Sequence, residues 1–276
     1  EYPSEAAAKA LAGALKGATP EQQALLAGSL GRQGHPSSAN ALAGLLVSDD
    51  PAVLDEAASA LASLDGGAGI ALLEEDFAKA DADRRKAFYP ACVKAAMSQV
   101  AAGNCAGAAK LLDMLYDAVS PGPVRAAALN GMVACAPDKA PELLARAIAD
   151  ADPEIARTAL GLARGTAGKA VTGALVALLD SAPVERVPAV LDTLAARGDA
   201  EAAPGAAKLA ASEDAAVAVA ALRALAAVGD ASHAGLLVDL SVKAKGDVRE
   251  TARESLRLLR DKKTDDALVD IAKAAG

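Results

Sequence analysis

The chain contains only two histidines, His35 and His233, the residue type best suited to metal binding or proton transfer near neutral pH. His35 directly precedes Pro36 in an expected loop, and His233 falls in the first turn of an expected helix. Neither belongs to a His-x-x-x-His or His-Glu arrangement, so the ligand spacing of a histidine metal site is missing. A nucleophilic triad would need a histidine near Ser or Cys in space. We therefore expect no catalytic residue, no metal and no cofactor.

Two further patterns imitate ligand sites. The segment Gly165-Thr-Ala-Gly168-Lys169 is similar to a phosphate loop, but its glycines are three apart and Ala170 replaces the metal-binding hydroxyl. It also follows a helix pattern, whereas a phosphate loop follows a strand, so we interpret it as a helix end followed by a helix start. The run Glu74-Glu75-Asp76 suggests a divalent cation, but consecutive helix positions point in different directions and cannot converge on one ion. We expect this run on a solvated outer face.

Three cysteines, Cys92, Cys105 and Cys135, make an odd number without metal-ligand spacing. We expect buried, reduced thiols, which favours a reducing compartment. The localisation nevertheless stays open between cytoplasm and periplasm. The chain opens at Glu1 without Met, and it is expected to be part of a longer precursor or polypeptide. No signal peptide is visible, and no apolar run approaches the roughly 18 residues that a membrane span needs, so we expect a soluble protein.

The composition is alanine-rich and acidic, with 53% hydrophobic residues, 2% aromatic residues and a net charge of −8. Alanine favours helices, and the hydrophobic content favours a folded chain. The acidic balance disfavours nucleic acid as a partner. Locally, residues 241–263 contain eight Lys or Arg and four acids, a balance of 8 − 4 = +4. We expect a solvated helix with internal ion pairs there, and an acidic or phosphate-bearing partner is the alternative.

A unit of about 31 residues recurs along the chain. In each unit an aliphatic or aromatic anchor follows a turn, a small residue usually stands four positions later, and an apolar residue usually stands eight later. The anchors are Val53, Phe88, Val124, Ile155, Val187, Val217 and Val248, at spacings of 35, 36, 31, 32, 30 and 31 residues. A fixed period in this range indicates stacked supersecondary units, none of which can bury its apolar face alone.

Each unit is expected to be two short helices joined by a turn. Asp50, Asp152 and Asp214 precede the second helices as predicted N-caps. We expect helix pairs near 4–32, 37–64, 68–102, 104–136, 139–165, 168–198, 200–229 and 231–260, and a final cap helix near 264–275. The fold predicted is all-α, a single repeat domain over 1–276. Both Phe, all three Cys and all three Met fall between 77 and 135, where we expect them to fill the core, although a recognition patch is the alternative.

The pattern resembles the HEAT-repeat family. The Asp-Pro-x-aliphatic turn and an Arg one or two places after the anchor, as in Arg125, Arg157 and Arg249, carry the resemblance. The resemblance implies an α-solenoid, a right-handed superhelix of about eight antiparallel helix pairs whose second helices line a concave face. It also implies a protein-interaction or scaffold role. Some relatives are hydroxylases with paired His-Glu metal ligands, which this chain lacks. Pro188 and the missing Arg in several units depart from the pattern.

We therefore predict a non-catalytic module that binds a protein or peptide with acidic or polar groups on its concave face. A passive structural spacer in a larger assembly and, further off, a lyase-type HEAT-like enzyme are the alternatives. Partner-binding residues are expected on second helices, off the anchor stripe, because arginine there can bind carboxylates while its stem lies over small side chains. They are Arg157, Arg164, Arg197, Arg223 and Arg257.

Overall fold

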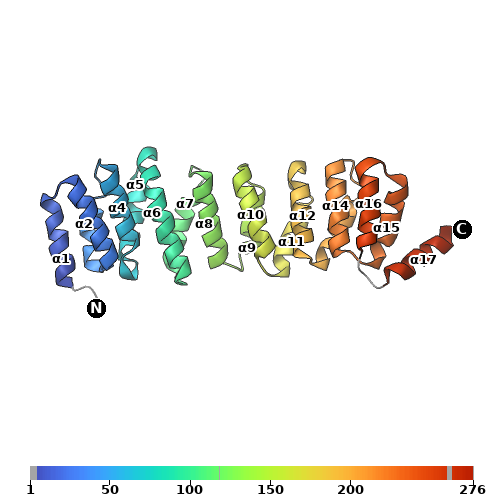
Figure 1. Cartoon of the computed structure of the whole chain (residues 1–276), viewed down its shortest axis with the longest axis horizontal. Helices are drawn as coiled ribbons and strands as arrows, with labels where there is room; N and C mark the ends of the chain where they lie inside the picture. Colours follow the sequence, from blue (N-terminus) through green and yellow to red (C-terminus); the bar gives the residue numbers. More distant parts are fainter. Residues whose placement is uncertain (1–4, 118, 260–262, 276) are drawn as a thin grey trace. The chain divides into compact units, whose positions relative to one another are not determined.

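A computed structural model of the chain describes residues 5–117, 119–259 and 263–275. Within these ranges the chain forms seventeen α-helices and no strand, which confirms the predicted all-α fold. The chain divides into two compact units, Glu1–Ala136 and Pro137–Gly276. Each unit is a stack of helix pairs (Figure 1). The predictions of a single domain over 1–276 and of a right-handed superhelix stay predictions.

The described part of unit 1 contains four helix pairs, with three short 3-10 turns between or within them. Its α-helices are α1 (Glu5–Ala14), α2 (Pro20–Gln33), α3 (Ala39–Ala43), α4 (Pro51–Ala62), α5 (Ala68–Lys79), α6 (Ala82–Ala101), α7 (Cys105–Leu115) and α8 (Gly122–Cys135). The 3-10 turns are Leu15–Gly17, Pro36–Ser38 and Asp65–Gly67.

The described part of unit 2 contains four further helix pairs and a final single helix. Its α-helices are α9 (Ala140–Ile148), α10 (Pro153–Gly165), α11 (Lys169–Leu178), α12 (Val187–Arg197), α13 (Ala203–Leu209), α14 (Ala215–Val228), α15 (Ala234–Lys243), α16 (Gly246–Leu258) and α17 (Thr264–Ala275). The 3-10 turns are Val184–Arg186, Ala200–Ala202 and Ala231–His233. These bounds confirm the eight predicted pairs and the final helix; Arg260, expected in the last pair, lies outside the described residues.

Within each unit the second helix of every pair packs against the second helix of the next pair. The order is α2, α4, α6 and α8 in unit 1, and α10, α12, α14 and α16 in unit 2. The predicted aspartates begin three of these helices. The carboxylate of Asp50 accepts hydrogen bonds from the amides of Ala52 (2.9 Å) and Val53 (3.3 Å), and Asp152 and Asp214 cap their helices in the same way. The Pro188 departure is explained as well, because this proline lies in the first turn of α12, where no amide donor is needed.

The anchor stripe forms most of the core. Val53, Ile155 and Val217 are buried, and so are the alanines four positions after the anchors, Ala57, Ala128, Ala159, Ala221 and Ala252. Val124 and Val248 are only half-buried, which corrects the expectation for these two anchors. For Val248 the reason is its place in the stack: α16 packs against α14 and α15, and α17 then packs against α15. No later second helix in the described chain covers the first turn of α16.

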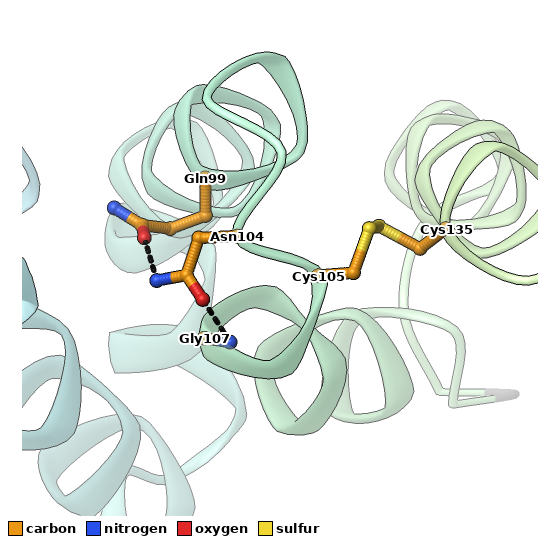
Figure 2. Close-up of a disulfide and its surroundings, with 5 residues drawn as sticks. All are labelled: Gln99, Asn104, Cys105, Gly107 and Cys135. Atoms are coloured by element: carbon orange, nitrogen blue, oxygen red, sulfur yellow. Dashed lines mark hydrogen bonds between the residues drawn. A yellow bond between two sulfur atoms is a disulfide. The ribbon is translucent and has the colours of Figure 1, made fainter.

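Two of the three cysteines form a disulfide, which corrects the expectation of reduced thiols. Cys105 is the first residue of α7 and Cys135 is the last residue of α8. Because a hairpin of two helices returns to its starting end, these two residues meet with their Cα atoms 5.3 Å apart and their sulfur atoms bonded (Figure 2). Next to the disulfide, Asn104 caps α7 through the amide of Gly107 (3.1 Å). The cysteines therefore no longer favour a reducing compartment.

The bulky residues between 77 and 135 supply core side chains in unit 1. Phe77, Phe88, Tyr89 and Cys92 are buried, and the rings of Phe77 and Tyr89 meet edge to face with centroids 5.6 Å apart. Cys92 is a free thiol, and burial, followed by the nearby charge of Glu74, raises its pKa to about 12. These residues support the predicted core-filling role over a recognition patch.

Glu74 is placed differently from the expectation of a solvated face. Its side chain is only 11% exposed, and its carboxylate pairs with the ammonium of Lys110 on α7 at 2.9 Å. Glu75 lies exposed and pairs with Lys79 one turn later on α5. The carboxylates therefore separate, as consecutive helix positions require, but Glu74 faces the next helix pair rather than water.

Candidate functional site

The second helices of unit 2 share an exposed stripe on the side away from the buried anchors. It consists of the exposed and half-buried residues two, five or six, and nine or ten positions after each anchor, which fall on one face at 3.6 residues per turn. Most of its uncharged members are small, including Gly161, Ala189, Ala196 and Ala227, all exposed or half-buried. We call this face the second-helix stripe. The arginines predicted to bind a partner occupy positions of this stripe.

Arg157 and Arg164 lie seven residues apart on α10, two turns along the same face. Both are exposed, while their neighbours Ala156 and Ala163 are buried. Neither guanidinium makes a hydrogen bond or ion pair to any described residue. Their donors are directed to solvent and remain available to a ligand.

Arg223 holds the corresponding place on α14. It is exposed between the buried Leu222 and Ala224, and it also has no hydrogen-bond or ion-pair partner among the described residues. Arg257 on α16 is exposed over 75% of its side chain, and its Nη1 atom lies 3.1 Å from Oε2 of Glu254. An exposed pair of this kind contributes little, about 0.3–0.5 kcal/mol for helical neighbours, so a partner's carboxylate can compete for Arg257.

The net charge of the stripe is opposite in sign to the net charge of the whole chain. Its exposed charged residues are Arg157, Arg164, Asp192, Arg223, Glu250, Arg253, Glu254 and Arg257. Five cations and three anions give 5 − 3 = +2, against −8 for the complete sequence. A ligand approaching the stripe therefore meets a locally positive surface on an acidic protein, which favours acidic groups.

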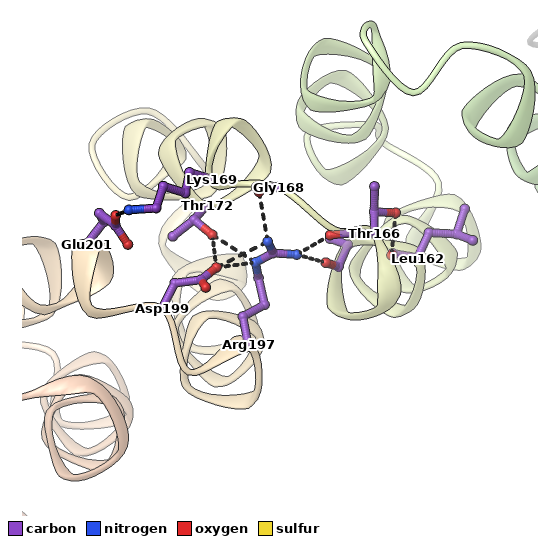
Figure 3. Close-up of polar contacts among 9 residues, drawn as sticks. Leu162, Thr166, Gly168, Lys169, Thr172, Arg197, Asp199 and Glu201 are labelled. Carbon is purple, nitrogen blue, oxygen red and sulfur yellow. Dashed lines mark hydrogen bonds and ion pairs between the residues drawn. The ribbon is translucent and has the colours of Figure 1, made fainter.

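Arg197 does not fit the predicted binding role, because the fold uses its donors. Its side chain is only 5% exposed. Nε donates to the Thr172 hydroxyl (2.9 Å) and to Asp199 (3.2 Å). The terminal nitrogens donate to the carbonyls of Ala163, Thr166 (2.6 Å) and Gly168 (3.0 Å) (Figure 3). Arg197 is the last residue of α12, so its side chain turns across the helix end instead of outward.

The Arg197 contacts also explain the segment that imitates a phosphate loop. Helix α10 ends at Gly165 and α11 begins at Lys169, and the carbonyls of Thr166 and Gly168 between them bind the guanidinium. Gly168 has φ of 108°, a conformation that favours glycine. This confirms the interpretation as a helix end and a helix start. The sequence does contain a signal for the structural role of Arg197. The residue directly precedes Gly198 and Asp199, where α12 ends.

Arginines one place after the anchor have a structural role that the sequence pattern did not reveal. Nε of Arg249 donates to the carbonyl of Ala244 (2.6 Å), just after α15, and Nε of Arg125 donates to the carbonyl of Tyr116 (3.4 Å) at the end of α7. Each ties the second helix to a carbonyl just after the end of the first. Arg157 lies two places after its anchor and is exposed instead. Of the three arginines that carry the family resemblance, only Arg157 is therefore available to bind a partner.

The histidines serve as local caps. Asp230 and His233 form a capping box at the start of the last helix pair, and Nδ1 of His35 accepts from the amide of Ser37 (3.2 Å). In the described ranges no group of three or more His, Cys, Asp or Glu side chains is placed to hold a metal ion. None of the described helices combines the length and the apolar character that a membrane crossing requires.

Comparison with known proteins identifies the repeat. Residues 7–89 match the family model of HEAT repeats, in agreement with the resemblance found in the sequence. A search of curated proteins returned no sequence match.

Solved structures with a similar helical arrangement include human deoxyhypusine hydroxylase (16% identity, TM-score 0.39, covering 93% of this chain and 85% of that one). The complex of CpcE and CpcF of phycocyanin lyase from Nostoc sp. PCC7120 matches at 17% identity and a TM-score of 0.40, over 94% and 97% of the two chains. A chain from a study of the interaction between cadherin and beta-catenin matches at 15% identity and a TM-score of 0.43. This match covers 95% of the present chain and 63% of the other chain.

Proposed function

We propose that the protein is a non-catalytic interaction module that binds an acidic or polar segment of a partner protein on the second-helix stripe. The observation that carries this proposal is the contrast among the arginines of unit 2. Arg197 is buried and its donors are consumed by the fold, whereas Arg157, Arg164 and Arg223 are exposed with no described partner. Repeated helices present extended surfaces, and arginine recognises carboxylates with two parallel hydrogen bonds.

The surroundings of these arginines support the same proposal. Small residues such as Gly161 and Ala227 surround them, so a bound segment can approach the helix backbones closely while the arginine stems lie along the surface. Because the groups are exposed, the attraction is screened by salt, and affinity is expected to fall as ionic strength rises above the physiological value. A passive spacer is the alternative, and it predicts no partner that depends on this face.

The test compares two variants with the same change of charge. The stripe variant carries Arg157→Glu, Arg164→Glu, Arg223→Glu and Arg257→Glu. The control variant carries Lys169→Glu, Lys208→Glu, Lys243→Glu and Lys273→Glu, at residues that are 64–82% exposed and pair only with surface acids. Both are expected to keep the helical circular dichroism of the native chain. A protein retained from an extract by the native chain and the control variant, but lost with the stripe variant, supports the proposal. Retention by all three, or by none, supports the spacer.

A further inference from the structure

Unit 1 has a hollow on its own second helices that no sequence motif marks. It has a volume of about 240 Å³ and spans α2, α4 and α6. It is lined by Gly28, Gly31, Arg32, Glu56, Ser59, Ala60, Ser63 and Lys94. This space equals that of about eight water molecules, enough for one side chain and smaller than the roughly 300–1,000 Å³ of a cofactor site.

The hollow exists because α2 carries two glycines where it meets α4. A Cβ atom on Gly31 would lie 2.7 Å from the Cα atom of Ala60, so the two helices are in backbone contact there. A Cβ atom on Gly28 would lie 2.9 Å from Oε2 of Glu56 and 3.5 Å from Nη1 of Arg32. The floor is therefore backbone and small side chains, and the polar heads of Glu56 and Arg32 reach over it.

Cations approach the hollow from both sides, since α4 lies between α2 and α6. Arg32 on α2 is exposed, and its one described hydrogen bond is from Nη2 to the Ser29 hydroxyl (3.0 Å), which leaves its other donors unused. Lys94 on α6 is exposed and makes no hydrogen bond or ion pair to a described residue. Glu56 likewise has no described partner, so the three groups give the hollow a charge of 2 − 1 = +1.

We propose that this hollow binds the carboxylate of an acidic side chain from a partner protein. Arg32 and Lys94 donate to the carboxylate oxygens, and the Ser59 hydroxyl, which has no described partner, adds a third donor. Glu56 accepts an amide N–H of the bound segment, which favours a carboxylate carried by a peptide over a free anion. The site uses only residues of unit 1 and is independent of the second-helix stripe.

The test is a titration of the ¹⁵N-labelled full chain with three blocked tripeptides that differ at one residue. Acetyl-Gly-Glu-Gly-amide should shift the amide resonances of Gly28, Gly31, Ser59 and Ser63 in a saturable way. The neutral acetyl-Gly-Gln-Gly-amide should bind at least about tenfold more weakly, because it lacks the charged contact that the carboxylate makes. The third peptide carries phosphoserine at the same position, and it should bind no more tightly than the Glu peptide. Shifts that are equal for the Glu and Gln peptides, or spread over the whole surface, overturn the proposal. Stronger binding of the phosphoserine peptide shows a phosphoryl site and overturns the carboxylate assignment.

Variants assign the binding to the named residues. The double variant Arg32→Gln, Lys94→Gln should abolish the localised shifts. A control that removes the same charge elsewhere on unit 1, Lys79→Gln with Lys86→Gln, should leave them unchanged, because these lysines are 67–70% exposed and pair with Glu75 and Asp83. Glu56→Gln should raise the affinity for the phosphoserine peptide while the Glu peptide still binds. Binding that survives in the Arg32, Lys94 double variant contradicts the site.

Discussion

The guanidinium of Arg197 and the carboxylate of Asp199 meet at the end of α12, with Nη2 and Oδ2 3.1 Å apart. The Thr172 hydroxyl donates to the same carboxylate, and the guanidinium also binds carbonyls at the end of α10. Three successive helices, α10, α11 and α12, are thereby joined through one side chain (Figure 3). Arg197 therefore has a structural role, unlike the exposed arginines of the same unit.

Replacing Arg197 with Ala should destabilise unit 2 by about 3 kcal/mol, because the change removes the cation beside the Asp199 carboxylate and the donor that three carbonyls share. Hydrogen exchange of peptides covering 163–172, followed by mass spectrometry, should show faster exchange in the variant. Arg257→Ala is the matched control, since its side chain is 75% exposed, and it should change stability by less than about 0.5 kcal/mol. Equal effects of the two substitutions would rule out the structural role of Arg197.

The same network predicts a dependence on pH. The hydrogen bond from Thr172, followed by the charge and hydrogen bond of Arg197, lowers the pKa of Asp199 from its ordinary value of 3.8. A carboxyl whose folded pKa is lowered stabilises the fold above its ordinary pKa and loses that contribution as the pH falls through the folded value. Native chain and Asp199→Asn variant should therefore differ in exchange protection of 163–172 at pH 6. The difference in exchange protection should shrink below about pH 3.8. A difference that persists at pH 2 would contradict a stabilising role of the ionised Asp199 carboxylate.

The disulfide gives a prediction for unit 1. The unreduced chain should show one thiol after denaturation, that of Cys92, and three after reduction. Breaking the Cys105–Cys135 bond releases a loop of 30 residues, which in the chain-entropy model costs about 3–4 kcal/mol of stability. The double variant Cys105→Ser, Cys135→Ser should match the reduced native chain in urea denaturation, and reduction should not affect this variant. Three reactive thiols in the unreduced chain would exclude the disulfide.

Two glycines test how closely the helices pack. A Cβ atom on Gly69, in the first turn of α5, would lie 2.0 Å from the carbonyl oxygen of Leu61, so Gly69→Ala must displace α5 from α4. We expect a loss of at least about 2 kcal/mol, in the range of overpacked cores. Gly161 in α10 has nothing within 4 Å of its Cβ position, so Gly161→Ala should stabilise its unit by about 0.5–1 kcal/mol. Thermal denaturation followed by circular dichroism distinguishes the two directions, and a neutral Gly69→Ala would contradict the packing.

The repeated elements could be predicted from the sequence because each is specified locally. The anchors at Val53, Ile155 and Val217 recur at a fixed period, and the aspartates at 50, 152 and 214 mark helix starts through bonds to amides two or three residues away. Helix propensity and capping act over one or two turns, so a single chain displays them directly.

Features that depend on contacts between helices could not be predicted in this way. Cys105 and Cys135 are 30 residues apart without a recognised spacing, and only the hairpin brings them together. Arg197 has the position of an exposed stripe residue, but its place at the end of α12 turns it toward α10. Glu74 is buried, and its carboxylate pairs with Lys110 of the next helix pair. The hollow at Gly31 likewise requires two helices in backbone contact, which no local pattern records.

The exposed arginines of the second-helix stripe form the proposed binding site for the partner. The most direct measurement is the dissociation constant of the purified partner, identified by the comparison of variants, for the native chain, the stripe variant and the control variant. The stripe variant should bind at least about tenfold more weakly, and further addition of salt should weaken native binding, because exposed Arg–carboxylate contacts are lost and screened. The control variant should bind like the native chain. An unchanged dissociation constant for the stripe variant, with its helical circular dichroism intact, would contradict binding through these arginines.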